Sequence, residues 1–178
     1  SARLNPAVAG MSAFKIAENS GFAIPKEDQV IAVLCDTVGA AEPMSREKLS
    51  PVLAIYKVKD AAEGFAKCKE MLEFGGLGHS AGIHCHDQKM ADEFGDKEPA
   101  IRIIWNSPTT FGGIGNVYNS FLPSLTLGCG SYGHNSVAGN TSAVNLINVK
   151  RVGKRRNTMQ WFKVPQKIYF ERNSIQYL

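Results

Sequence analysis

Short apolar runs and amphipathic stretches alternate along the first 106 residues of the chain. Four of the runs have the length of a strand, and the first two are continuously apolar, which is typical of strands covered on both faces. The four predicted strands are QVIAVLC (29–35), SPVLAIYKV (50–58), SAGIHCH (80–86) and AIRIIWN (100–106).

Helical spacing of apolar residues separates these runs. Lys59–Gly76 has the clearest helical pattern, because its apolar residues share one face and two glycines end it. Shorter helices are predicted for Ser12–Phe22, with Ser12 as the N-cap, and for Asp87–Asp96. Strands that alternate with helices predict an α/β domain with a mainly parallel sheet and crossover helices. The apolar face of the longest helix comprises Ala62, Phe65, Ala66, Met71 and Leu72.

The composition changes between Ser107 and Asn140, where glycine, serine, threonine and asparagine dominate and no period holds. Interspersed apolar residues favour an ordered loop that packs on the sheet. These residues are Ile114, Val117, Tyr118, Phe121, Leu122, Leu125 and Leu127. Residues 167–178 (KIYFERNSIQYL) then have the pattern of two short strands. We therefore predict a lobe over residues 1–160 and a C-terminal β extension over residues 161–178 that contacts another chain or domain.

Composition narrows the classes of function. The 178 residues suffice for one domain, and 44% hydrophobic and 20% charged residues are ordinary for a soluble globular domain. No apolar run approaches the roughly 20 residues of a membrane helix, and no leader segment is recognisable, so a cytoplasmic location without membrane contact is expected. The net charge of +4 is too small to indicate nucleic-acid binding but is compatible with anionic, phosphorylated cofactors.

Cys129 stands between two glycines in LTLGCGSYGHNS (125–136) and is a candidate nucleophile. A nucleophilic thiolate needs a lowered pKa, which backbone N–H groups or His134 as a base could provide. A packed thiol in a glycine turn is the alternative, since cysteine is among the most buried residue types. No CxxC pair occurs, and reduced thiols are expected for Cys35, Cys68, Cys85 and Cys129.

Two histidine motifs are candidate chemical sites. In HCHD (84–87), His84 and His86 would share one face of a strand, but a metal site needs further ligands. No second cluster has zinc spacing, so no metal site is predicted. His79 follows the glycines that end the long helix and precedes a strand, where α/β folds place their chemistry, although a lone histidine is more often structural.

Charged residues mark two further segments. Glu42 and Glu47 lie in EPMSREKLSP (42–51), where a carboxylate could accept hydrogen bonds from the ribose of a nicotinamide nucleotide; a solvated loop is the alternative. KRVGKRR (150–156) is the one basic cluster. Because no aromatic platform accompanies it, a solvated helix face or a subunit contact is favoured over nucleic-acid binding.

Several segments follow one another in an order that resembles the C-terminal part of CoA-acylating aldehyde dehydrogenases, and most closely the aldehyde dehydrogenase half of bifunctional aldehyde-alcohol dehydrogenases. The segments are EKLSPVLAIY, GGLGHS, GGIGNVYNSFLPSLTLGCGSYGHNS, LINVKRVGKRR and MQWFKVPQKIYF. The resemblance implies a partial catalytic lobe of Rossmann-like fold and the reversible conversion of aldehyde, CoA and NAD⁺ to acyl-CoA and NADH, with acetaldehyde as the expected aldehyde. In that family a cysteine attacks the aldehyde, hydride passes to NAD⁺ and CoA takes the acyl group.

The resemblance implies roles for individual residues. Glu47 matches a glutamate that hydrogen-bonds the nicotinamide ribose, and Leu49 matches an apolar position near the nicotinamide. His79 matches an active-site group that assists proton transfer or positions the thiol of CoA. The segment around the acyl and substrate pocket contains Gly112, Gly113, Gly128, Gly130 and Ser131. The family has Trp-Gly-Gly where this chain has Tyr132, Gly133 and His134.

The resemblance also places the nucleophilic cysteine and most of the NAD site upstream of this chain, so the chain alone is expected to be inactive. Family members form dimers, and the bifunctional ones form helical filaments, so a homo-oligomer is expected. Two alternatives stay open. One is a non-catalytic binding or assembly module derived from this fold, which a natural start near Ser1 would indicate. The other is an acyltransferase with Cys129 as nucleophile, which a lowered thiol pKa at that position would indicate.

Overall fold

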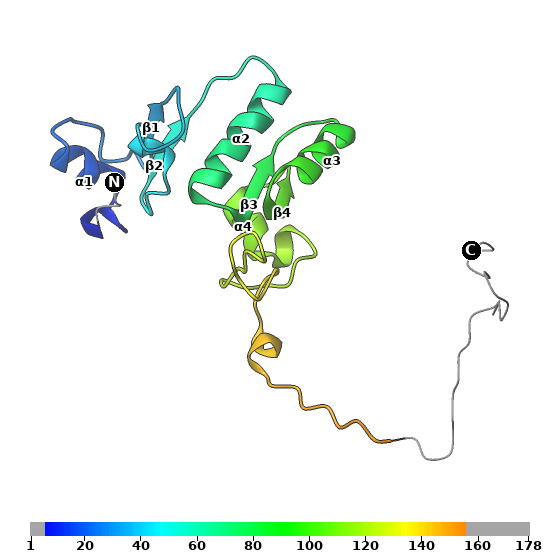
Figure 1. Cartoon of the computed structure of the whole chain (residues 1–178). Coiled ribbons are helices and arrows are strands. Elements are labelled where there is room, and N and C mark those ends of the chain that lie inside the picture. The colour runs from blue at the N-terminus through cyan, green and yellow to red at the C-terminus, as the bar shows by residue number, and fades with distance from the viewer. Residues whose placement is uncertain (1–5, 156–178) are drawn as a thin grey trace. The chain divides into compact units, whose positions relative to one another are not determined.

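The computed structural model describes residues 6–155 (Figure 1). The chain divides into two units, Ser1–Leu146 and Ile147–Leu178, and every described helix and strand lies in the first. Both strand pairs are parallel, which confirms the predicted α/β class. The four strands form two separate two-stranded sheets, β1 with β2 and β3 with β4.

The first sheet pairs β1 (Ile31–Leu34) with β2 (Val52–Ile55), and the 3₁₀ helix η2 (Pro43–Ser45) lies in their connection. Half-buried and exposed residues alternate along both strands. Leu34 is 67% exposed and Leu53 is 56% exposed. The prediction that these strands are covered on both faces is therefore wrong for the described residues, because half of their side chains face solvent.

The second sheet pairs β3 (Gly78–Ile83) with β4 (Ala100–Trp105), and α3 (Gln88–Lys97) makes the crossover between them. Together with α2 (Ala61–Gly75), these elements enclose the main core of the unit. Phe65 of α2 and Phe94 of α3 meet edge to face, with ring centroids 5.2 Å apart. The buried core cluster consists of Phe65, Leu72, Ala81 and Phe94.

Aspartate caps start both helices of this core. The Asp60 side chain accepts the backbone N–H of Glu63, and the Asp87 side chain accepts that of Lys89. Fewer residues of α2 are buried than its apolar pattern predicts, because Ala62 and Ala66 of the predicted apolar face are exposed.

Strand β3 is shifted toward the N-terminus relative to the predicted strand 80–86. It ends at Ile83, so His84, Cys85 and His86 follow it in a turn and the prediction of a shared strand face is wrong. Asn106 holds this turn: its side chain accepts the Cys85 backbone N–H at 3.0 Å and donates to the Cys85 carbonyl oxygen at 2.8 Å. Tertiary contact with the end of β4 therefore decides where β3 stops.

The glycine-rich segment 107–140 is ordered, as predicted, but not chiefly by its apolar residues. It contains α4 (Thr109–Ile114) and the 3₁₀ helix η3 (Asn116–Tyr118). Asn140 donates to the carbonyl oxygens of Gly113 and Leu122, at 3.0 and 2.7 Å. Leu125, by contrast, is 89% exposed. Asparagine side chains and close glycine contacts thus fix a loop whose larger apolar side chains partly face solvent.

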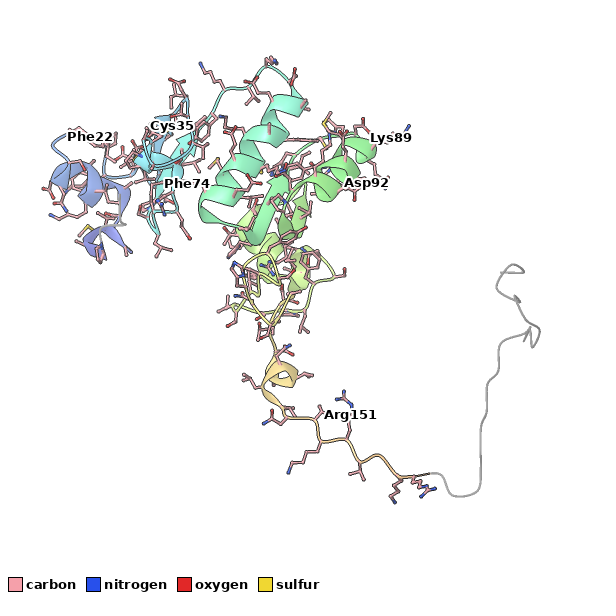
Figure 2. All side chains as sticks on the ribbon, viewed as in Figure 1. Phe22, Cys35, Phe74, Lys89, Asp92 and Arg151 are labelled. Carbon is pink, nitrogen blue, oxygen red and sulfur yellow. The ribbon has the colours of Figure 1, made fainter. Side chains whose placement is uncertain are left out.

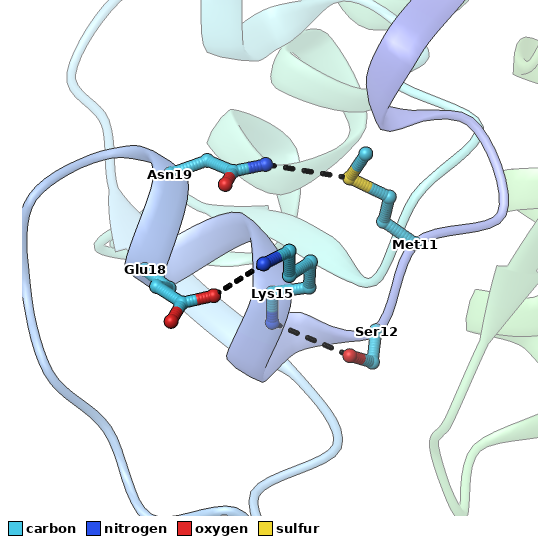
Figure 3. A network of polar contacts seen from close by, with 5 residues as sticks. All are labelled: Met11, Ser12, Lys15, Glu18 and Asn19. Carbon is cyan, nitrogen blue, oxygen red and sulfur yellow. Dashed lines mark hydrogen bonds and ion pairs between the residues drawn. The ribbon is translucent and has the colours of Figure 1, made fainter.

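The predicted N-cap of the first helix is confirmed (Figure 3). Ser12 precedes α1 (Ala13–Asn19), and its hydroxyl oxygen accepts the Lys15 backbone N–H at 3.3 Å. We expect Ser12→Ala to lower the free energy of unfolding by about 1 kcal/mol, measured by urea denaturation, because one helical N–H loses its acceptor. Ser20→Ala, at the other end of α1, is the control. Equal losses in the two variants would contradict the capping role.

The predicted β extension, residues 161–178, lies outside the described residues. Of the basic cluster 150–156, residues 150–155 are described; they are exposed and not helical, and Figure 2 labels Arg151 among them. The interpretation as a helix face is therefore wrong for residues 150–155, whereas a subunit contact stays a prediction. The remaining described 3₁₀ helices are η1 (Pro6–Val8) and η4 (Ala143–Leu146).

Candidate functional site

One groove of about 650 Å³ brings together the two polar residues to which the resemblance assigns functions. Glu47 reaches it from the loop before β2, and His79 reaches it from β3. The two residues lie far apart in sequence, so the folded unit, and not local spacing, places them on one cavity. Other lining residues used below are Lys48, Cys68, Ser80 and Thr109.

The loop that carries Glu47 is anchored on both sides of that residue. Arg46 lies over the ring of Phe74 on α2, with the guanidinium carbon 4.3 Å from the ring centroid. The Lys48 amine donates to the carbonyl oxygens of Met44 and Arg46, at 2.6 and 2.8 Å. Burial lowers the pKa of Lys48. Glu47 itself is exposed and makes no hydrogen bond or ion pair within residues 6–155, so both its oxygens are free to accept.

His79 lies inside β3, whereas the sequence placed it just before a strand. Its side chain is exposed, and Nδ1 lies 3.2 Å from the hydroxyl oxygen of Ser80. The ring also borders a smaller cavity of about 200 Å³, together with Thr109, Gly113 and Leu127. His79 therefore borders both the groove and the smaller cavity.

Arg102 of β4 is a site residue that sequence analysis missed. It is only 2% exposed, lies opposite Ser80 in the sheet, and donates to the Ser80 hydroxyl and to the His79 carbonyl oxygen, each at 3.0 Å. No carboxylate lies within ion-pair distance of it in the described chain. The available signal was the single charged residue in the apolar run AIRIIWN, since a charge in a buried strand needs partners.

Sequence analysis also missed the pair formed by Cys68, which lines the groove, and Glu98. Burial raises the pKa of the Cys68 thiol to about 12, and the nearby Glu98 carboxyl adds to this rise. Glu98 follows α3, is 4% exposed, and neither of its carboxylate oxygens has a hydrogen-bond partner in the described residues. Burial likewise raises the pKa of Glu98. Cys68 lines the groove, but its thiol stays protonated at neutral pH.

Only part of the glycine segment reaches these cavities. Gly113 borders the smaller one, while Gly112 packs against Ile104 of β4. Gly128, Gly130 and Ser131 line neither of the two, and Leu49, which is 60% exposed, lines neither as well. Glu47 and His79 thus share the groove, His79 and Gly113 share the smaller cavity, and the other predicted site residues line neither.

Cys129 lies in a tight turn. Its backbone N–H donates to the Asn135 side chain at 2.9 Å, and its Cβ lies against Gly133, where an added side chain would overlap it. Within residues 6–155, no three of the His, Cys, Asp and Glu side chains are arranged to hold a metal ion. In the same range, no helix is both long and apolar enough to cross a membrane.

The fold of the chain is similar to part of the fold of acetylating aldehyde dehydrogenases. The crystal structure of such an enzyme from Geobacillus thermoglucosidasius aligns with a TM-score of 0.82 at 40% identity, covering 91% of this chain and 36% of that one. No protein-family model matches the chain.

More particularly, the chain is homologous to one segment of the aldehyde-alcohol dehydrogenases. It is 58% identical over 177 residues to that of Streptococcus pneumoniae serotype 4, and 42% identical over 176 residues to bifunctional aldehyde-alcohol dehydrogenase of Escherichia coli K12. These alignments cover 99% and 97% of this chain but 20% of each relative, so the chain spans about a fifth of their length. The resemblance noted in the sequence is therefore confirmed.

Proposed function

We propose that the chain is part of an NAD-dependent, CoA-acylating aldehyde dehydrogenase, with acetaldehyde and acetyl-CoA as the expected substrate and product. The observation that carries the proposal is the shared groove of Glu47 and His79. The homology to acetylating aldehyde dehydrogenases and aldehyde-alcohol dehydrogenases supports it. NAD and CoA are the expected cofactor and co-substrate.

The free carboxylate of Glu47 fits the nicotinamide ribose of NAD. An ionised carboxylate only accepts hydrogen bonds, and a ribose diol offers two donors. The side-chain contacts of Arg46 and Lys48, the two neighbours of Glu47, restrain this loop, so the acceptor is positioned before a ligand arrives. The exposed side chain of Leu49 adds an apolar surface in the same loop. When bound, NAD⁺ would accept hydride from the substrate.

The four cysteines support a nucleophile that lies outside this chain. Cys35 is 6% exposed, and the pKa of Cys68 is raised to about 12, so neither suits nucleophilic attack at neutral pH. The Cys85 thiol donates to the Asp87 carbonyl oxygen at 3.3 Å and lines neither cavity. Cys129 lines neither cavity as well. The chain alone is therefore proposed to be inactive.

The smaller cavity beside His79 has a volume of about 200 Å³ and suits a small acyl group. We assign Gly113 to its wall, and Gly112, Gly128, Gly130 and Ser131 to the loop that supports this wall. The segments 1–160 and 161–178 stay assigned as a partial catalytic lobe and an assembly or interdomain extension. The whole protein is proposed to act in the cytoplasm as a homo-oligomer, either a dimer or a helical filament.

A substitution of Glu47 in the natural full-length protein tests the cofactor role. Glu47→Gln is expected to raise the KM for NAD⁺ about tenfold and to leave the KM for CoA unchanged, because one charged acceptor is lost. Glu27→Gln, at an exposed carboxylate that lines neither cavity, is the matched control. An unchanged KM for NAD⁺ would remove Glu47 from the cofactor site.

The location of the nucleophile has a separate test. Turnover of acetaldehyde, CoA and NAD⁺ by the purified 178-residue chain would refute the placement of the nucleophile outside it.

A further inference from the structure

Arg102, Ser80 and His79 form a chain of hydrogen bonds that runs from the interior of the second sheet to the groove. Arg102 is buried in β4, and its Nε donates to the Ser80 hydroxyl oxygen at 3.0 Å. The same hydroxyl lies 3.2 Å from His79 Nδ1. A second donor of Arg102, Nη2, holds the His79 backbone through its carbonyl oxygen, also at 3.0 Å. One guanidinium therefore fixes both the main chain and the side-chain partner of His79.

The chemistry of the three groups determines which of them donates and which accepts in this series of hydrogen bonds. An arginine side chain has five N–H donors and no acceptor, so Ser80 accepts in its contact with Arg102. The single proton of the Ser80 hydroxyl is then left to be donated. His79 Nδ1 is the only other side-chain atom to which Ser80 is bonded among the described residues. This proton allows Ser80 to donate to Nδ1.

We propose that Arg102 is a positioning residue which, through Ser80, makes His79 Nδ1 an acceptor, so that the neutral ring carries its proton on Nε2 and presents a donor to the groove. This inference rests on the proposed role of His79 at the active site. A neutral histidine has one donor and one acceptor nitrogen, and the bond at one fixes the role of the other. His79 then supplies a hydrogen bond to an oxygen that gains negative charge, such as the carbonyl oxygen of an aldehyde or thioester.

Arginine suits this position better than lysine does. An arginine guanidinium has no acceptor atom at any accessible pH, so Arg102 always donates to Ser80 and this hydrogen bond does not reverse when the pH changes. Its planar fork reaches the Ser80 hydroxyl and the His79 carbonyl at once, whereas an ammonium is a point charge on a flexible stem. Burial adds a constraint, because an Arg102 that left these partners would be an unpaired charge inside the fold.

The ring nitrogens of His79 report the tautomer directly. Nitrogen-15 NMR of the 178-residue chain is to be recorded at about pH 8.5, above the ordinary histidine pKa, with His79 assigned from the His79→Gln spectrum. Among the four histidines, His84 and His86 are exposed and have no ring hydrogen bond to any of residues 6–155, so they serve as the reference for the tautomer ratio. We expect the two ring resonances of His79 to be more widely separated than theirs, with Nε2 protonated.

Substitutions distinguish an effect of the Arg102–Ser80–His79 hydrogen bonds on the tautomer from an effect of packing alone. Ser80→Ala and Arg102→Met should bring the His79 resonances to the positions of His84 and His86, whereas Ser80→Thr, which keeps the hydroxyl, should preserve the separation. Ser20→Ala, at an exposed serine outside both cavities, is the matched control. Backbone amide spectra will show whether each variant is folded. If Arg102→Met does not fold, Ser80→Ala alone tests the proposal.

Two outcomes would overturn the proposal: a proton on Nδ1 of His79 in the unsubstituted chain, or resonances that Ser80→Ala does not move. The measurement needs no turnover, so it is independent of the proposed function. If His79→Gln leaves the activity of the full-length protein unchanged while the tautomer is as expected, the catalytic role of His79 fails and the positioning by Arg102 stands.

Discussion

Gly128→Ala is expected to lower the free energy of unfolding by about 3 kcal/mol, measured by urea denaturation of the chain. Gly128 is buried, and its N–H donates to the Gly139 carbonyl oxygen at 2.9 Å. An added Cβ would overlap the Val137 carbonyl oxygen and lie 2.7 Å from the carbonyl carbon. Both are backbone atoms, so no change of rotamer relieves the overlap. The two segments must separate and weaken the hydrogen bonds between them.

Gly139→Ala is the matched control, because it lies on the partner segment of the same turn. Apart from Gly139 and its two chain neighbours, no heavy atom of residues 6–155 lies within 4 Å of a Cβ added at Gly139. We expect its stability to change by less than about 0.5 kcal/mol. Similar losses in the two variants would show that any side chain in this loop is costly, and would contradict the specific overlap at Gly128.

The Gly128 substitution should also reach His79. The following turn packs against the start of β3, since a Cβ at Gly78 would lie 2.8 Å from the Cβ of Tyr132. Gly78 precedes His79, and its N–H donates to the Pro99 carbonyl oxygen at 2.8 Å. A displaced loop therefore shifts the strand that presents the histidine. We expect the His79 ring resonances to move in Gly128→Ala and to stay in place in Gly139→Ala.

Local signals predicted the helices well and the strand ends poorly. Ser12 begins α1 because a serine hydroxyl replaces a missing helical acceptor, and this needs only neighbouring residues. The end of β3 depends on Asn106, which lies beyond the next strand. The exposed faces of Leu34 and Leu53 also had no local signal, because an apolar run looks the same whether one or both of its faces are covered.

The candidate site divides in the same way. Glu47 and His79 could be singled out in the sequence because polar residues next to strands favour chemistry, and the resemblance then gave them roles. Their shared groove arises from tertiary packing and could not be predicted. Arg102 and Glu98 are buried charged residues that belong to no motif. Arg102 matters because it donates to Ser80, and Glu98 because its carboxylate oxygens have no hydrogen-bond partner in the described residues. Sequence spacing carries no information on such tertiary contacts.

Glu98→Gln is expected to stabilise the chain at neutral pH and to have little effect in acid. Both oxygens of the Glu98 carboxyl are buried and lack a hydrogen bond of ordinary geometry within residues 6–155, and the nearby Cys68 thiol and Lys69 offset this burial only in part. Glu98 also caps the C-terminal end of α3, where the helix dipole disfavours negative charge. Burial raises the pKa of Glu98 above its unfolded value. Between the unfolded and folded pKa values, the folded chain therefore holds one proton more than the unfolded chain, so stability falls as pH rises through that window.

Glutamine resembles the protonated carboxyl and cannot ionise, so the variant should escape this loss. We expect a gain of about 2 kcal/mol at pH 8, where an unpaired buried charge is costly, and a difference near zero at about pH 4. Urea denaturation at both pH values measures it, and Glu27→Gln, at an exposed carboxylate, should show no such dependence. A gain of equal size at both pH values would mean that packing, and not ionisation, distinguishes the two side chains. A loss at pH 8 would mean that the Glu98 charge has a stabilising partner and that the carboxyl is not the uncompensated group that its burial implies.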